Sequence, residues 1–423
     1  MADAEHFSAA KEIIARDPAR RYVVPSAPGK RHGDDHKVTD LLYMCHQLAQ
    51  HHIDFGEVFA LIADRYHQIY DGLHLSQDLD AELEKVRTEI MAGASEDFVA
   101  SRGEYLNGLL LAEFLGYTFV DAATVIAFTR DGNYDARETM RKMRHVLQDA
   151  ERAVIPGFYG ADEEGEIHTF SRGGSDVTGA IVARATHADL YENWTDVSGF
   201  LQADPRIVDN PRPIELVSYK ELRELSYMGA SVLHEEAIFP VREKSIPINV
   251  RNTERPEEPG TLIVSDQERE GTSGITGIAG MQQFTAITIE KTLMDEEKGF
   301  LRKVVTVFET NGVPIAHIPS GIDSISVVVR SQDIRFKVKK IVEELRIFCH
   351  PDTIAIQEGI SLIAIVGRGM VSSPGIAARV FSRLADAGVN IRIITQGASE
   401  LSIMVGVEDI QFEEALRALY QAI

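Results

Sequence analysis

Residues 171–176 read Ser-Arg-Gly-Gly-Ser-Asp and run into the apolar-periodic stretch 177–186 (VTGAIVARAT), which is typical of a glycine turn that opens a helix. A second turn at residues 195–200 (TDVSGF) follows a strand-like run at 189–194 and leads to Asp-Pro-Arg at 204–206. Helix N-termini and glycine turns present backbone N–H groups to anions. A doubly wound α/β sheet builds its crevice for a phosphorylated ligand from two such turns. The two segments therefore predict an α/β fold and chemistry on phosphate.

Strand-like and helix-like runs alternate through the first 250 residues. We expect strands at 21–24, 117–122, 153–158, 189–194 and 246–250, and helices at 3–16, 38–52, 57–70, 78–92, 97–115, 135–150 and 177–186. Such alternation implies a largely parallel sheet with helices on both faces. We expect residues 246–250 to be the last of these strands. Residues 252–274 are rich in charge, proline, glycine and serine, which predicts a linker.

An internal repeat follows the predicted linker. A shift of 76 residues aligns two segments without a gap, placing Gly299 on Gly375, Gly312 on Gly388, Gly321 on Gly397, and Ser326-Val327 on Ser402-Ile403. Each copy is typical of a ferredoxin-like βαββαβ unit. A chance match of two βαβ segments is the alternative. Duplication is favoured because one offset holds over turn glycines and apolar positions alike.

The composition is that of a globular protein of two or three domains. Of 423 residues, 44% are hydrophobic and 26% are charged, and the formal net charge is −22. This acidic balance disfavours nucleic acid or an anionic membrane as a partner, because either would require a basic face. An anionic substrate is still allowed, because a few arginines and helix ends can make a local positive pocket.

Three features favour a cytoplasmic protein. The two cysteines, Cys45 and Cys349, lie far apart in the sequence and are expected to be reduced thiols. The first ten residues lack the basic region and apolar core of a signal peptide. No apolar run approaches the ~20 residues that a membrane helix needs.

The first turn has the residue types that bind an anion. Gly173 and Gly174 let the backbone approach a ligand, Ser175 could cap the helix and donate to an anion, and Arg172 offers a two-pronged donor. Asp176 could be a second cap or a carboxylate beside a metal. The alternative is a plain loop with an N-cap serine.

Other candidates lie where strands end. Residues 195–206 could hold a nucleotide, with Arg206 on its terminal phosphates; the alternative is a solvated loop with a local Asp–Arg pair. Ser26 and Lys30 follow an early strand, at the edge where open α/β sheets bind ligands, although a Pro-Gly loop with ordinary capping is the alternative. Glu104 could accept from a substrate ammonium, but a glutamate in a first helical turn is favourable by itself.

Motifs of other classes are missing from the sequence. There is no GxGxxG before a helix and no GxxxxGK[ST], which disfavours a dinucleotide fold and a P-loop. No Cys/His spacing indicates zinc, and His51-His52 is expected to lie on a helix surface, so we predict no metal held by protein ligands alone.

The chain resembles the aspartate kinases, in which an amino acid kinase fold, a mostly parallel sheet between helix layers, precedes two ferredoxin-like ACT domains. The resemblance extends from the first residue to the last. It is carried by Ser26-Ala27-Pro28-Gly29, Arg102-Gly103-Glu104, Gly157-Phe158-Tyr159-Gly160, residues 172–176, Thr195-Asp196-Val197, Asp204-Pro205-Arg206 and residues 229–234 (GASVLH). It implies a catalytic domain at residues 1–268 and ACT domains at 275–355 and 356–423.

This family phosphorylates the β-carboxylate of L-aspartate with Mg-ATP, the first step toward lysine, threonine, methionine and isoleucine. The resemblance implies ATP and Mg²⁺ as cofactors. By position, it implies catalytic roles for Ser26, Arg172 and Asp176, aspartate contacts at Thr39, Glu104, Arg172, Gly173 and Ser175, and nucleotide contacts at Thr195, Asp196, Leu201 and Arg206. Phosphoryl transfer needs positioning and charge neutralisation more than covalent help from the protein, which agrees with this set.

The sequence departs from the family in two places. The family begins with a central strand ending in Lys-Phe-Gly-Gly, whose lysine and glycines hold the transferring phosphate, and this sequence begins with the helix that follows it. We therefore expect the polypeptide as written to have little or no kinase activity, and residues restored upstream of Met1 to recover it. A non-catalytic amino-acid sensor is the alternative of a different class. Leu201 also replaces an aromatic found in some relatives, and Glu254 lies near a lysine of others.

The ACT pair implies feedback inhibition by lysine, threonine or both. The effector site is implied at Met294, Gly299, Phe300, Leu301, His317 and Ser320 in the first copy, and at Gly375, Ile376 and the loop from Gln396 to Glu400 in the second. Exposed strand edges favour pairing across chains, as a homodimer or homotetramer. A kinase acting on glutamate, acetylglutamate or UMP is the same-fold alternative. The tandem ACT units, with Glu104 and residues 172–176, argue against it.

Overall fold

The computed structural model describes residues 1–171, 173–230, 233, 238–267, 274–397 and 401–423. The chain divides into two compact units. Unit 1 comprises residues 1–199 and 232–265, and unit 2 comprises residues 200–231 and 266–423. Among the helices that the structure describes, none is both long enough and apolar enough to cross a membrane.

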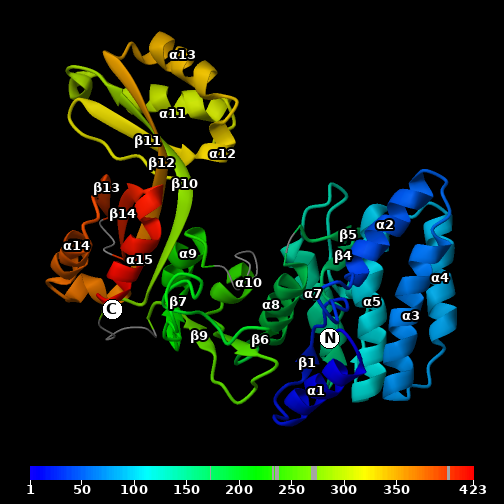
Figure 1. Ribbon diagram of the computed structural model, residues 1–423. Coiled ribbons are helices and arrows are strands. Elements are labelled where there is room, and N and C mark those ends of the chain that lie inside the picture. Colours follow the sequence, from blue (N-terminus) through cyan, green and yellow to red (C-terminus); the bar gives the residue numbers. More distant parts are fainter. Residues whose placement is uncertain (172, 231–232, 234–237, 268–273, 398–400) are drawn as a thin grey trace. The chain divides into compact units, whose positions relative to one another are not determined.

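Unit 1 combines a helical layer with short, mostly parallel strands. Its helices are α1 (Ala4–Ala15), α2 (Val38–Gln50), α3 (Gly56–Leu73), α4 (Leu79–Met91), α5 (Glu96–Leu115), α6 (Ala122–Val125), α7 (Ala136–Leu147), α8 (Gly174–Thr186) and α10 (Ile238–Arg242). Helices α2 to α5 lie side by side (Figure 1), and their shared core includes the fully buried Leu42, Ile62 and Leu110. Most of α5 is buried, so this helix carries polar residues such as Glu104 into the interior.

The strands of unit 1 form three small sheets. Strands β1 (Tyr22–Val23), β3 (Ala153–Val154) and β2 (Thr118–Phe119) are parallel, in the order β1-β3-β2. Strand β6 (Tyr191–Thr195) pairs in parallel with β8 (Ile248–Asn252), and β8 pairs antiparallel with β9 (Thr261–Val264). Strands β4 (Tyr159–Ala161) and β5 (Ile167–Thr169) form an antiparallel pair. The parallel arrangement and the predicted helices are confirmed.

Strand β9 corrects one prediction. Residues 246–250 were expected to contain the last strand, with a linker within or just after residues 252–274, but Thr261–Val264 adds an antiparallel strand to β8. Gly260, directly before β9, lies close to β8, because it has a φ of 69° and a side chain there would clash with the Val250 carbonyl oxygen. Prolines and charged residues dominate the composition of this segment and mask the short run Thr261–Val264, in which three of the four residues are β-branched.

Unit 2 is built on one five-stranded antiparallel sheet, in the order β11-β10-β12-β14-β13. The strands of this sheet are β10 (Gly277–Glu290), β11 (Ser324–Arg330), β12 (Thr353–Val366), β13 (Ile393–Gln396) and β14 (Ser402–Glu408), and the short strand β7 (Leu216–Ser218) of unit 2 lies outside it. Its helices are α9 (Tyr219–Tyr227), α11 (Phe300–Thr310), α12 (Ser331–Ile334), α13 (Val338–Cys349), α14 (Ile376–Asp386) and α15 (Phe412–Tyr420). The long strands β10 and β12 pair with each other and serve both copies of the repeat (Figure 1). The start of β10 therefore closes the second copy, and Ile278 lies in its core.

The repeat is confirmed, with one correction to its alignment. Helices α11 and α14 begin 76 residues apart, each after a glycine with positive φ, Gly299 and Gly375. Strands β11 and β14, however, begin 78 residues apart and share one burial pattern, so Ser402 corresponds to Ser324 and not to Ser326. The segment between Gln396 and Ser402 is two residues longer than the corresponding segment between Ser320 and Ser324. A shift of two keeps every side chain on the same face of a strand, so the ungapped alignment still matched apolar with apolar residues.

Candidate active site

The N-terminus of α8 is the first part of the site. Gly173 is the N-cap, at a φ of 58° that glycine adopts without strain, and the helix begins at Gly174. Ser175 therefore lies inside the first turn, which corrects the expectation that it caps the helix. Its backbone N–H is one of the first four of the helix, which have no partner within the helix and favour an anion. Arg172 lies outside the described residues.

Two residues of the loop after β3 lie against this turn. A Cβ atom on Gly157 would be 2.5 Å from Ser175 Oγ, and a Cβ atom on Gly174 would be 2.8 Å from the Phe158 Cα. Phe158 has a φ of 81°, and its N–H donates to Thr178 Oγ1 at 3.1 Å. A non-glycine residue in this region of φ is strained, and such strain is concentrated at functional sites. The sequence motif contained Phe158 but gave no sign of its backbone conformation.

Glu104 is the second part of the site. It lies in the middle of α5 and not in its first turn. The alternative, that Glu104 is only a favourable glutamate at a helix N-terminus, is therefore wrong. Its side chain is 6% exposed and accepts from the backbone N–H of Ala27, while Oε2 has no hydrogen-bond partner among the described residues. Burial raises the pKa of Glu104 to about 7. A buried carboxylate with a free oxygen is a site for a cation.

The loop after β1 joins these two parts. Asn107, one turn after Glu104, donates from Nδ2 to the Ser26 carbonyl oxygen at 2.6 Å. Gly157 N–H donates to the Pro25 carbonyl oxygen at 3.1 Å, so the same loop also reaches the residue that lies against Ser175. The predicted residues Ser26, Glu104 and Ser175 are therefore gathered at the carboxyl ends of β1 and β3. Ser26 is exposed, as a residue that meets a ligand must be.

Two residues of helix α3, Arg65 and Tyr66, hold this region through hydrogen bonds. The Tyr66 hydroxyl donates to the Gly103 carbonyl oxygen at 2.7 Å, directly before Glu104. Arg65 forms a buried ion pair with Asp35 at 2.5 Å and donates to the Gly29 carbonyl oxygen at 2.8 Å. These bonds fix the loop between β1 and α2, and Thr39 follows it in the first turn of α2, half-buried.

The predicted nucleotide residues fall in both units. In unit 1, Thr195 ends β6, its carbonyl oxygen accepts from Thr253 N–H at 2.8 Å, and its hydroxyl donates to Asp196 at 3.2 Å. In unit 2, Arg206 is 86% exposed in its side chain and forms a fork with Asp204 at distances from 2.6 to 3.1 Å, beyond the half-buried Leu201. This local Asp–Arg pair is the alternative that the sequence left open for Arg206.

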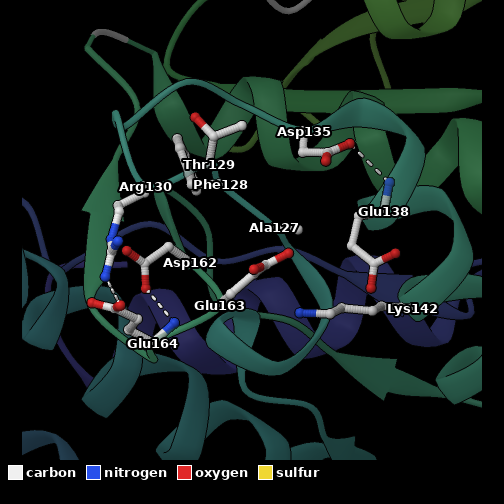
Figure 2. Close-up of a pocket in the computed structure, with 10 residues that line it drawn as sticks. All are labelled: Ala127, Phe128, Thr129, Arg130, Asp135, Glu138, Lys142, Asp162, Glu163 and Glu164. Carbon is white, nitrogen blue, oxygen red and sulfur yellow. Dashed lines mark hydrogen bonds and ion pairs between the residues drawn. The ribbon is translucent and has the colours of Figure 1, made fainter.

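A separate pocket of about 360 Å³ lies beside α7 and the β4–β5 pair (Figure 2). Its lining residues are Ala127, Phe128, Thr129, Arg130, Asp135, Glu138, Lys142, Asp162, Glu163 and Glu164. None of the predicted site residues is among them. Five carboxylates face two basic side chains, so the pocket disfavours a phosphate group.

The predicted effector residues are distributed over both copies of the repeat in unit 2. Three of them, Met294, Phe300 and Ile376, are buried in the two hydrophobic cores, whereas Leu301, Ser320 and Gln396 are exposed. His317 Nε2 lies 2.6 Å from Thr395 Oγ1, a hydrogen bond between the two copies, and burial lowers the pKa of His317. Residues 398–400 of the second predicted loop lie outside the described residues. Over the described part of the chain, no three His, Cys, Asp or Glu side chains are grouped as metal ligands.

Comparison with known proteins gives similarities over the whole length. The amino acid kinase family matches residues 8–252, and the ACT domain matches residues 363–423. Aspartokinase 3 of Bacillus subtilis (strain 168) is 37% identical over 435 residues, covering 97% of this chain and 93% of that protein. The crystal structure of Clostridium acetobutylicum aspartate kinase is 50% identical, with a TM-score of 0.92 and coverage of 100% and 97%. Aspartokinase III of E. coli, in complex with aspartate and ADP, shares the fold at 24% identity and a TM-score of 0.74, with coverage of 100% and 97%.

Proposed function

We propose that this chain, which belongs to the amino acid kinase family and within it to the aspartokinases, transfers the terminal phosphoryl group of ATP to the β-carboxylate of L-aspartate. The products are 4-phospho-L-aspartate and ADP. The observation that carries the proposal is the Glu104 carboxylate, which is buried, has one oxygen without a partner among the described residues, and has a pKa of about 7. A substrate ammonium completes such a group, because it supplies both the missing charge and the missing donor.

The acceptor lies between α5 and α8 in this proposal. Its α-ammonium donates to Glu104. Its α-carboxylate points to the first turn of α8, which offers the backbone N–H groups of Gly174 and Ser175 and the Ser175 hydroxyl. Arg172 pairs with the α-carboxylate, and Gly173, Thr39 and Ser26 complete the wall. The α-ammonium and the α-carboxylate are then held apart from the β-carboxylate that reacts.

Thr195, Asp196, Leu201 and Arg206 are our proposed contacts of ATP. Mg²⁺ bound with the nucleotide would neutralise charge on the phosphates. Asp176, in the first turn of α8, is the carboxylate of this chain that we place closest to that charge. The protein contributes orientation and charge, which are the main requirements of phosphoryl transfer.

We also propose that the ACT domains bind lysine, threonine or both as feedback inhibitors, and that they pair across chains in a homodimer or homotetramer. The two copies contact each other through His317 and Thr395, so a change at one predicted loop can reach the other. We place the enzyme in the cytosol, where the buried free thiols Cys45 and Cys349 stay reduced.

A coupled assay of ADP release tests the substrate. The acceptors are L-aspartate, L-glutamate, N-acetylglutamate and UMP, each at equal concentration with Mg-ATP. The rates are measured for the 423-residue chain and for a form with a Lys-Phe-Gly-Gly strand added before Met1. We expect ADP release with L-aspartate and with none of the other three acceptors. Turnover with another acceptor, and none with aspartate, would contradict the proposal.

A further inference from the structure

Two polar side chains of β6 bind the first turn of α8. Asn193 Nδ2 donates to Asp176 Oδ1 at 2.8 Å, and the Tyr191 hydroxyl donates to the Asp176 carbonyl oxygen at 3.1 Å. The same amide lies 3.2 Å from the Tyr191 oxygen. Residues 191 and 193 share one face of the strand, so that β6 holds both the side chain and the backbone of Asp176.

The contact between β6 and the first turn of α8 is buried. Asn193 is 8% exposed, and burial raises the pKa of Tyr191, with a further contribution from the charge of Asp176. On α8, Gly179 leaves room for the tyrosine, because a Cβ atom there would be 2.7 Å from the Tyr191 oxygen. A hydrogen bond from a buried amide to a carboxylate is charge-assisted and stronger than a neutral one.

The chemistry of the donor matters as much as the distance. A lysine or arginine at position 193 would orient Asp176 but would also neutralise it. The asparagine amide is uncharged, so it orients the carboxylate without itself neutralising the negative charge. Two residues further along the same strand is Thr195, a proposed nucleotide contact, about 7 Å away at the usual rise of a strand.

We propose that Asn193 is a positioning residue for phosphoryl transfer: it orients the Asp176 carboxylate and couples the acceptor turn of α8 to the strand that ends in Thr195. This inference rests on the proposed function. Sequence motifs gave no reason to select Asn193, because its role depends on a contact between a helix and a strand 17 residues apart. The strand holds the two sides of the reaction at a fixed spacing, and a misplacement of about 1 Å can cost about 100-fold in rate.

The test compares Asn193→Leu and Asn193→Asp with Asn249→Leu, in the form of the enzyme that turns over aspartate. Asn249 is a matched control: it lies on the neighbouring strand β8, opposite Glu192, and has no assigned role in the site. The leucine removes the donor at similar volume. The aspartate keeps the shape and places a like charge beside Asp176. The kcat, the KM for aspartate, the KM for ATP and the melting temperature are measured for each variant.

We expect both Asn193 variants to lose kcat by about 10- to 100-fold, with each KM within about twofold of the wild type. Asn249→Leu keeps kcat within about twofold. An unchanged kcat in Asn193→Leu, or a loss of kcat that Asn249→Leu matches at an equal fall in melting temperature, would overturn the positioning role. The isosteric Asn193→Asp decides the question if the leucine variant fails to fold. A wild type without aspartate-dependent turnover contradicts the proposed function instead, so the two failures are distinct.

Discussion

Gly157 lies directly against Ser175: a Cβ atom on residue 157 would be 2.5 Å from the Ser175 hydroxyl oxygen and 2.7 Å from the Ser175 Cα. The second of these atoms is backbone, so no side-chain rotation can relieve the overlap. Gly157 also donates its N–H to the Pro25 carbonyl oxygen. A single glycine thus sets the spacing between the loop after β1 and the acceptor turn of α8.

Gly157→Ala is therefore expected to displace the first turn of α8 and to lower kcat/KM for aspartate by about 100-fold. Gly33→Ala is the control, because a Cβ atom on Gly33 would meet nothing within 4 Å and its φ is not positive. Steady-state kinetics of both variants check the prediction. Equal activity of the two would show that the contact at Ser175 does not matter for the acceptor.

The pKa of Glu104 predicts how aspartate binding depends on pH. Burial raises this pKa to about 7, and a bound ammonium requires the ionised form. Below about pH 7 the free enzyme holds a proton there that aspartate must displace. The KM for aspartate is expected to rise about tenfold per pH unit on the acid side of 7 and to level off above it. Kinetics from pH 5.5 to 8.5 measure this, and a KM that stays flat across the range would exclude the role.

The same carboxyl predicts a pH-dependent stability. Its pKa is higher in the folded chain than the ordinary value of 4.5, so the folded state holds the proton between pH 4.5 and 7, and Glu104 weakens the fold progressively as pH rises through that window. Glu104→Gln removes the charge. We expect the variant to be more stable than the wild type at pH 8, by on the order of 3.5 kcal/mol at 1.4 kcal/mol per pKa unit, and equally stable near pH 4.5. Thermal melts of both proteins without aspartate decide this; a larger gain at the acid end would reverse the sign and refute it.

The buried ion pair of Arg65 and Asp35 is expected to stabilise the fold, including the loop after β1 that carries Ser26. Removing one partner leaves the other charged and buried, at a cost of about 3–5 kcal/mol. Arg65→Met should therefore lower the denaturation midpoint strongly. Arg31→Met is the matched control: Arg31 binds the same carboxylate at 2.9 Å but is partly exposed, so its loss should cost under about 1 kcal/mol. Urea melts that rank the two variants in the opposite order would contradict this account of the loop.

Much of the fold could be predicted because its signals are local. Amphipathic periodicity placed the long helices, and the glycines at 299 and 375 marked the starts of α11 and α14. Strand β9 was missed because four residues cannot outweigh the composition around them. The two-residue shift between β11 and β14 was missed because it preserves the facing of every side chain.

The site divides in the same way. Ser175 and Glu104 were selected by residue type and by the family resemblance, and the structure brings both to the loop after β1. Asn193 and Phe158 were not selected, because one acts through a helix 17 residues earlier and the other through its backbone conformation. A local sequence pattern predicts neither the contact of Asn193 nor the backbone conformation of Phe158. Such residues become visible only when the contacts between elements are known.

The most direct measurement of the central claim is the identity of the phosphorylated carboxylate. An acyl phosphate reacts with hydroxylamine to give a stable hydroxamate, which mass spectrometry can assign to the α- or the β-carboxyl group of aspartate. With Mg-ATP, L-aspartate and hydroxylamine, the account predicts the β-hydroxamate of aspartate, formed in equal amount with ADP and lost in Glu104→Gln at low aspartate concentration. Formation of the α-hydroxamate, or of ADP without any aspartyl hydroxamate, would contradict it.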